Sequence, residues 1–288
     1  MNNLAIVSAC SDKYFQLFLE LLHSIKKNVE LKKIDICLIN NGLNEKNLSY
    51  IKKKVQIVSP VIKFIKNSPV DPFEYVQLFL PKYFPNYKKY IWIDADCWLN
   101  SGSAIKMLVE ASNKGYFAVS SMGDRDCPGA MIRIDWLFRN AGIVKSQNIK
   151  HSFKLGLSTQ EARYLGLKPH LNAGVFALDK KSIFWSKWIK NFKKLRGPRY
   201  GRAQLAMNYS VYIGHNKVNI LPNYINCLIS PDIVLYDEKK KKFVERYYPH
   251  KEIGIIHLAG KDIRFKDKKM KIKNLYNKLV FKSLRFNK

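Results

Sequence analysis

The chain has 288 residues, 47% hydrophobic and 13% aromatic, so it is long enough to fold around a large core and is not a disordered polymer. Its 51 Lys and Arg against 22 Asp and Glu give a formal net charge of +29, which favours a polyanionic partner, either a nucleic acid, an anionic lipid surface or a phosphorylated substrate. The five cysteines form no Cys-x-x-Cys pair, which argues against a disulfide framework or a cysteine zinc site and favours a reducing compartment; they are Cys10, Cys37, Cys97, Cys127 and Cys227.

The start of the chain lacks the pattern of a signal peptide. Its first apolar run covers only residues 4–10, and the polar pair Ser11 and Asp12 ends it. No later segment approaches the roughly 20 apolar residues that a membrane-spanning helix needs. We therefore expect a cytoplasmic protein that is soluble or peripheral on the inner face of the membrane.

The first part of the chain alternates short apolar runs with segments of helical periodicity. Strands are expected at 4–10, 34–39, 55–58, 89–93 and 116–120, and helices at 14–27, 45–54, 72–80 and from Ser101 or Ser103 to about 113. Asp71 is a candidate cap for the third helix, and Pro81 is expected to end or kink it. Alternation of this kind predicts an α/β fold with a mainly parallel sheet covered by helices.

The pattern is looser between residues 123 and 170. Short helical pieces around Trp136 and Ala162 are expected there, as in an inserted lobe that shapes a cleft. Beyond it we expect a strand at 175–178 and helices at 183–193 and 203–212. Residues 1–260 are therefore predicted to form one domain.

Residues 261–288 differ in composition, with eleven Lys and Arg against two Asp, interleaved with apolar side chains. This pattern predicts a basic amphipathic C-terminal tail that could dock on an anionic membrane surface. A plain solvated terminal helix is the alternative.

Two carboxylates directly follow residues 89–93, the best candidate for a buried strand. Asp94 and Asp96 are two residues apart, so their side chains project to the same side, at the strand end where a crevice opens. Oxygen ligands suit Mg²⁺ or Mn²⁺, which can bridge a diphosphate. The motif alone is weak, because Asp124 and Asp126 repeat it, and surface turn residues remain the alternative.

Four sequence blocks resemble, in chain order, the family 8 glycosyltransferases, retaining enzymes that include glycogenin and bacterial lipopolysaccharide galactosyl- and glucosyltransferases. The blocks are IVSACSDKY at 6–14, DAD at 94–96, LNAGVF at 171–176 and IIHLAG at 255–260. The resemblance spans nearly the whole chain. It implies the Rossmann-like GT-A fold, a UDP-sugar as donor, and a glycan or glycolipid acceptor of the lipopolysaccharide type.

The resemblance also implies roles for individual residues. The metal, Mn²⁺ or Mg²⁺, would be held by Asp94, Asp96 and His257. The nucleotide-sugar would be bound by Ala9, Asp12, Tyr14, Asp94, Ala95, Gly260, Lys261 and Arg264, with Asp12 on the base or ribose and Tyr14 stacked on uracil. Asn172 would meet the donor sugar, and Gln204 and either Asp124 or Asp126 would lie at the reacting centre. Taken one at a time, these residues have bland alternatives: His257 as a packed histidine, Gln204 as a helix-borne amide.

Three positions depart from the family pattern. Gln77 stands where the family has an arginine, Ala203 where it has an aspartate, and Ile263 begins the segment that replaces Lys-Pro-Trp. These changes leave the sugar open and keep a degenerate, non-catalytic protein as an alternative.

Other function classes fit less well. A nucleotidyltransferase would carry a glycine-rich phosphate loop near the first strand, and Ser8 to Tyr14 contains no glycine. A nucleic-acid-binding protein would explain the charge, but we find no helix-turn-helix, RNA-recognition, KH or zinc-finger pattern. An inverting GT-A glycosyltransferase is the closest rival.

Overall fold

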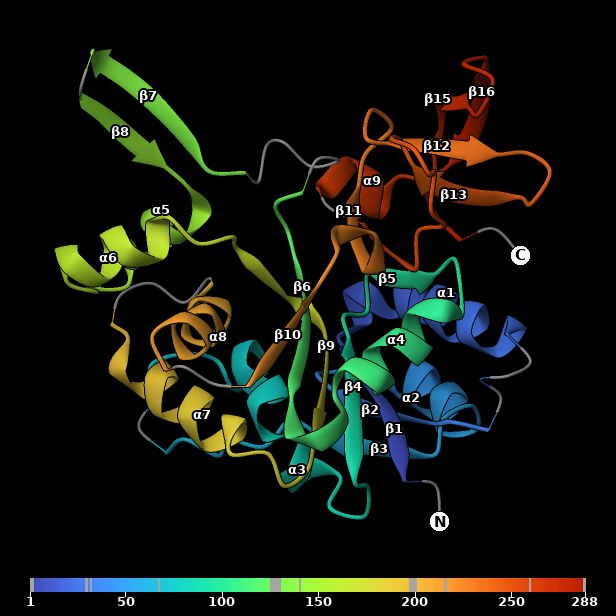
Figure 1. Ribbon diagram of the computed structural model, residues 1–288. Coiled ribbons are helices and arrows are strands. Elements are labelled where there is room, and N and C mark those ends of the chain that lie inside the picture. The colour runs from blue at the N-terminus through green and yellow to red at the C-terminus, as the bar shows by residue number, and fades with distance from the viewer. Residues whose placement is uncertain are drawn as a thin grey trace.

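The computed structural model describes residues 3–28, 31, 33–66, 68–124, 131–139, 141–196, 201–214, 217–258 and 260–286, except for the side chain of Lys261. Within these residues the central sheet is built from β1 (Leu4–Cys10), β2 (Asp35–Asn40), β3 (Ile57–Pro60), β4 (Lys89–Ile93), β6 (Phe117–Ser121), β9 (Leu171–Asp179) and β10 (Val218–Leu221). Their order is β10-β6-β9-β4-β1-β2-β3 (Figure 1). All neighbours are parallel except β9, which runs antiparallel to β4 and β6.

Helices cover both faces of this sheet. One face packs against α1 (Phe15–Lys27), α2 (Glu45–Lys52) and α4 (Ser103–Ala111). The other packs against the 3-10 helix η3 (Pro72–Phe79), α3 (Leu80–Tyr83), α7 (Phe184–Lys194) and α8 (Arg202–Tyr212). Alternation along β4 explains the two layers, since Tyr90 and Trp92 enter one cluster while Ile91 and Ile93 enter the other.

A smaller β-rich lobe stands at the carboxyl end of β4 (Figure 1). It contains β5 (Cys97–Leu99), β11 (Asn226–Ile229), β12 (Val234–Asp237), β13 (Lys242–Glu245), β14 (Ile255–Leu258), α9 (Lys261–Phe265), β15 (Lys269–Asn274) and β16 (Leu279–Ser283). Its core surrounds Trp98 and Leu284. Because β14 pairs antiparallel with β5, the segment after Asp96 lies beside the segment that carries His257.

A third part of the chain leaves the sheet after β6. It forms the hairpin of β7 (Arg133–Phe138) and β8 (Ala141–Lys145), followed by α5 (Gln147–Lys154) and α6 (Thr159–Gly166). The hairpin projects away from the body of the molecule at the upper left of Figure 1. Short 3-10 turns complete the described elements: η1 (Asp12–Tyr14), η4 (Asn113–Gly115) and η6 (Asn223–Ile225).

The mixed, mainly parallel sheet covered by helices is confirmed, but some expected elements are wrong. Trp136 lies in β7, not in a helix. Residues 72–79 form a 3-10 helix, capped by Asp71 as expected. This helix ends just before Pro81, as expected, and Pro81 lies in the first turn of α3, where a proline gives up no hydrogen bond. The cap of α4 is Gly102, so neither candidate serine caps it.

Residues 261–286 form part of the smaller lobe. β15 pairs with β12 and with β16, so the alternative of a terminal helix is wrong. Ile272 and Leu284 are buried, and the Arg285 side chain pairs with Glu20 of α1. The division of the chain at residue 260 stays a prediction.

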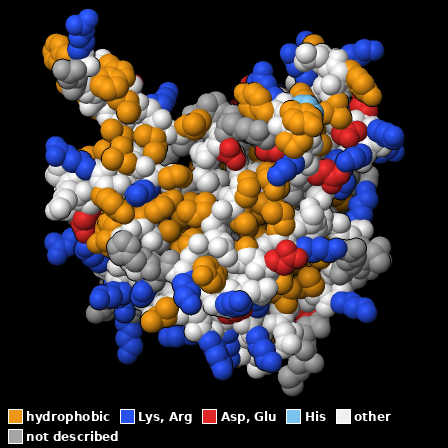
Figure 2. Space-filling view, in the orientation of Figure 1, with side chains coloured by type: hydrophobic (Ala, Val, Ile, Leu, Met, Phe, Trp, Pro, Cys, Tyr) orange, Lys and Arg blue, Asp and Glu red, His pale blue; other side chains and the backbone are white. Residues whose placement is uncertain are grey.

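Basic side chains are spread over the surface. Figure 2 shows many Lys and Arg and few Asp and Glu on the visible face, as the net charge of +29 requires. Among the described residues, no helix combines the length and the apolar character needed to cross a bilayer.

Candidate active site

A cavity of about 710 Å³ opens where the main sheet meets the smaller lobe. Its floor is formed by Ala9 at the end of β1, by Asp94, Ala95 and Asp96 after β4, and by Gly174 of β9. Ligand crevices are expected at the carboxyl ends of strands in open α/β sheets. Three of the four sequence blocks therefore meet here, and His257 of the fourth lines the same cavity.

Asp94 and His257 lie on either side of the space above Gly174. A Cβ atom on this glycine would lie 2.5 Å from Cε1 of His257 and 2.7 Å from Oδ2 of Asp94. The other oxygen of Asp94 accepts a hydrogen bond from Nε1 of Trp92 at 2.7 Å. Glycine is therefore what lets the two functional side chains come together over the strand.

Asp96 and His257 are both buried, and Nε2 of His257 lies 3.5 Å from Oδ1 of Asp96. Burial opposes the charge on each group, but their mutual attraction lowers the pKa of Asp96 and raises the pKa of His257. For Asp94, burial and then the charge of Asp96 raise the pKa to about 7. Two buried carboxylates whose pKa values are pushed in opposite directions are typical of a functional site, and a cation would stabilise the charge on both.

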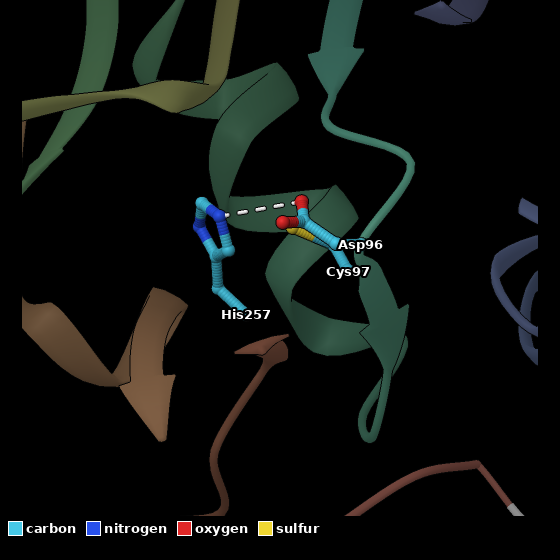
Figure 3. A group of neighbouring side chains, drawn as sticks. All are labelled: Asp96, Cys97 and His257. Carbon is cyan, nitrogen blue, oxygen red and sulfur yellow. Dashed lines mark ion pairs between the residues drawn. The ribbon is translucent and has the colours of Figure 1, made fainter. Parts of the chain in front are cut away.

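Figure 3 shows Asp96, Cys97 and His257, whose ligand-type atoms lie within 4.8 Å of one another. The cysteine was not among the predicted ligands. Burial and then the two nearby carboxylates hold the pKa of the Cys97 thiol well above its usual range, so it stays a neutral thiol and a weak ligand. Carboxylate oxygens and one imidazole nitrogen are donors that suit Mn²⁺ or Mg²⁺.

His257 is oriented from behind by an amide. Its Nδ1 lies 3.2 Å from Oδ1 of the buried Asn226 at the start of β11. Because Nδ1 donates to Asn226, Nε2 is the atom directed at Asp96: it carries a proton in the pair with the carboxylate and could bind a cation once that proton is released. Support of this kind is common for histidines that bind metals.

Arg264 of α9 closes one side of the site. Its Nε lies 2.8 Å from Oδ2 of Asp96, and its Nη1 donates to the hydroxyl of Tyr14 at 3.1 Å. The guanidinium also packs against the Tyr14 ring. Both residues line the cavity, so the structure brings the predicted Tyr14 and Arg264 together with the acidic pair.

Gln204 is held at the opposite wall by a chain of hydrogen bonds that sequence reasoning missed. Its Oε1 accepts from the backbone of Ala173 at 3.1 Å, and its Nε2 lies 2.6 Å from Nε2 of His170. Nδ1 of His170 lies 2.6 Å from Oδ1 of Asn148, whose Nδ2 donates to a backbone carbonyl. His170 therefore carries its proton on Nδ1 and accepts from Gln204.

Two predicted residues lie elsewhere. Asp12 is exposed and its carboxylate accepts hydrogen bonds from Asn44 and Asn47 at the start of α2, and it is not part of the cavity wall. Asp124 accepts from the backbone of Asn223 at 3.3 Å and also does not line the cavity. Their roles stay predictions.

Of the remaining predicted residues, some line the cavity and some lie outside the described part of the chain. Asn172 and Gly260 line the cavity, and Oδ1 of Asn172 accepts from the backbone of Gly174 at 2.8 Å. Asp126, Cys127 and the side chain of Lys261 lie outside the described residues.

With this geometry in place, comparison with known families is decisive. The sequence model described as glycosyl transferase family 8 matches residues 5–181, more than half of the chain. The chain belongs to glycosyl transferase family 8. The match covers Asp94, Asp96 and Asn172, while His257 and Arg264 lie beyond it.

Solved glycosyltransferases share the fold of this family 8 member. The apo structure of the bifunctional glycosyltransferase WbbM aligns with a TM-score of 0.55 and 14% identity over 90% of this chain and 46% of its own. The galactosyltransferase LgtC with donor and acceptor sugar analogs aligns with a TM-score of 0.50 and 14% identity, over 89% of this chain and 87% of its own. The chain thus spans less than half of WbbM. These likenesses show a GT-A fold. Curated protein sequences give no match.

Proposed function

We propose that the protein transfers a hexose from a nucleotide-sugar, with UDP as the nucleotide, to a glycan or lipid-linked acceptor, with retention of configuration. The observation that carries the proposal is that His257 lies beside both carboxylates, meeting Asp94 over Gly174 and Asp96 at 3.5 Å, in a chain of family 8. The cavity of about 710 Å³ has the size of sites that hold ligands of this kind.

A divalent cation, Mn²⁺ or Mg²⁺, would be held by Asp94, Asp96 and His257. When bound, it would offset the charge of the diphosphate and of the leaving nucleotide. Arg264 adds a permanent positive charge beside the carboxylate of Asp96. Arginine is well suited to binding phosphate oxygens. Arg264 directly follows Ile263, which stands where the family has the lysine of Lys-Pro-Trp.

The chain's own residues supply positioning and electrostatics. Tyr14 offers an aromatic face at the cavity wall for the base, and Asn172 lies against the floor where the sugar would sit. Gln204, fixed by Ala173 and His170, presents its amide near the acceptor hydroxyl that attacks the anomeric carbon. Groups held in place before reaction lower the barrier without reorganisation during the step.

The acceptor and location follow from the basic surface. We propose a surface-glycan acceptor of the lipopolysaccharide type and a peripheral position on the inner membrane face, supported by the Lys-rich β15 and by the net charge of +29.

Calorimetric titration with UDP and GDP, each with and without Mn²⁺, tests the donor site. We expect Mn²⁺-dependent binding of UDP that weakens at least about tenfold in Asp94→Asn and in Asp96→Asn, because each loses a carboxylate charge beside the diphosphate. Asp232→Asn, an exposed aspartate of the smaller lobe, is the matched control. Unchanged UDP binding in both site variants, or no binding of either nucleotide, would sink the proposal. The anomer of the product, determined by nuclear magnetic resonance, separates retention from inversion.

A further inference from the structure

The β7–β8 hairpin carries an apolar face whose side chains are exposed among the described residues. Ile134 stands opposite Val144 and Trp136 opposite Gly142, so these side chains share one face of the ribbon. A Cβ on Gly142 would lie 2.7 Å from Ile134 and 3.4 Å from the Trp136 ring, so the indole lies over the glycine. Phe138 follows at the end of β7.

The hairpin is unusually exposed for its composition. Every residue of β7 is exposed, with Trp136 at 67% and Phe138 at 77%. A two-stranded ribbon is marginally stable by itself in water, and contiguous exposed apolar surface marks an interaction site. Figure 2 shows this apolar surface along the projecting arm at the upper left.

The charges near the arm decide which kind of partner fits. Arg133, Arg139 and Lys145 are exposed at its base and tip, and Asp135 pairs with Lys145. A second copy of this chain, also at +29, would bring like charges together. An anionic bilayer offers both an apolar interior for the indole and phenyl rings and negative headgroups for the basic residues.

The β15–β16 hairpin also combines basic and apolar side chains that fit an anionic bilayer. On β15 the side chains of Lys269, Lys271 and Lys273 are exposed, while Ile272 between them is buried. Leu279 and Phe281, the partners of Lys273 and Lys271 on β16, are about 60% exposed. Figure 1 shows β15–β16 and β7–β8 at the same end of the molecule, one on each side, with α9 between them.

We propose that the β7–β8 hairpin is a membrane-binding arm, which places Trp136 and Phe138 in the interface of an anionic bilayer while β15 and β16 contact the headgroups. Aromatic rings flanked by Lys and Arg are favoured at this depth of a bilayer. Two contacts of this kind fix the orientation of the molecule as well as its affinity. The proposal rests on the peripheral membrane position proposed above, but it does not depend on the reaction, since binding is measured without any sugar donor.

The test is sedimentation of the full-length protein with phosphatidylglycerol vesicles and with phosphatidylcholine vesicles. We expect the wild type to bind the anionic vesicles, and Trp136→Ser with Phe138→Ser to lower the partition coefficient by about tenfold or more. Ile183→Ser removes an equally exposed apolar side chain at the N-cap of α7, away from both hairpins, and should change nothing. Thermal melting of each variant verifies the fold.

Two further variants locate the contact. Trp136→Phe keeps the apolar ring and should keep binding, but quenching of tryptophan fluorescence by brominated acyl chains should fall. Lys271→Gln with Lys273→Gln should weaken binding severalfold, whereas the same change at Lys190 and Lys193 of α7 should weaken it less.

Equal binding by the wild type and the Trp136→Ser, Phe138→Ser variant, or no binding to anionic vesicles, would overturn the proposal. So would a wild type that sediments as a dimer and becomes a monomer in that variant, since the hairpin would then bind a second copy.

Discussion

Gly174 is the residue on which the geometry of the acidic site depends. A methyl group there would stand 2.5 Å from His257 and 2.7 Å from Asp94, closer than van der Waals contact allows, so one or both side chains must move. We expect Gly174→Ala to lower the free energy of unfolding by about 1–3 kcal/mol and to weaken UDP binding at least about tenfold, as measured by urea unfolding and calorimetry. Wild-type affinity in this variant would show that Asp94 and His257 need not meet.

His170 makes a testable contribution to acid sensitivity. Burial, followed by the charge of His151, lowers the pKa of His170 to about 3, whereas an unfolded histidine titrates near 6.5. Below about pH 6.5 the unfolded chain binds a proton that the folded protein does not, so stability is lost as the pH falls toward 3.

We therefore compare the wild type with His170→Gln by urea unfolding at pH 6.5 and pH 5. The wild type should lose roughly 2 kcal/mol more than the variant over this interval, because glutamine has no proton to gain. Parallel losses in the two proteins would contradict a neutral, buried His170. The variant should also lower kcat more than it changes KM for the donor, since it loosens Gln204.

At the scale of elements, the last strands are held to α1 by a buried ion pair. Arg285 and Glu20 are each about 90% buried, with Nε of Arg285 2.8 Å from the carboxylate. Arg285→Met should cost about 3 kcal/mol in urea unfolding, because it leaves an uncompensated buried charge. The double variant Glu20→Gln, Arg285→Met should cost less than the single one. A larger loss in the double variant would contradict this.

The same elements show why some of the fold could be predicted and some could not. β4 reads as a strand because Tyr90 to Ile93 is continuously apolar and both faces of the strand are buried. β15 alternates Lys with apolar residues, a pattern that fits a strand. The sequence around it carries no signal for its partner, because β12 lies some 35 residues earlier in the chain. The helix expected around Trp136 is wrong because the aromatic residues there fit a short helix and a strand equally well. A projecting ribbon has no core that would impose a period of two on its apolar residues.

The candidate site divides in a similar way. Asp94 and Asp96 are found from their place directly after an apolar strand, and the resemblance to family 8 adds Asn172 and His257. His170 and Asn226 act through other side chains and carry no motif, although His170 directly precedes the Asn-Ala-Gly block, a position that could have drawn attention to it. Asp12 has the right motif, but Asn44 and Asn47 lie close enough to take its hydrogen bonds, and this depends on how α2 packs.

The whole molecule carries a net charge of +29. Repulsion among its Lys and Arg side chains destabilises the compact state. Salt screens this repulsion over roughly 10 Å at 0.1 M. Raising NaCl from low to near-physiological concentration should therefore raise the melting temperature by several degrees, measured by differential scanning fluorimetry without nucleotide. A melting temperature that falls with salt would mean that ion pairs such as Lys194–Glu161 outweigh the net repulsion.

The pairing of β5 with β14 has a consequence for synthesis of the protein. The acidic motif and His257 leave the ribosome more than 150 residues apart, and β14 must cross back to a strand made long before. Contacts this distant in sequence form late in folding. A nascent chain that already displays Asp94 and Asp96 therefore has no finished nucleotide site. In the proposed function, the donor site is complete only after residue 257 has been translated.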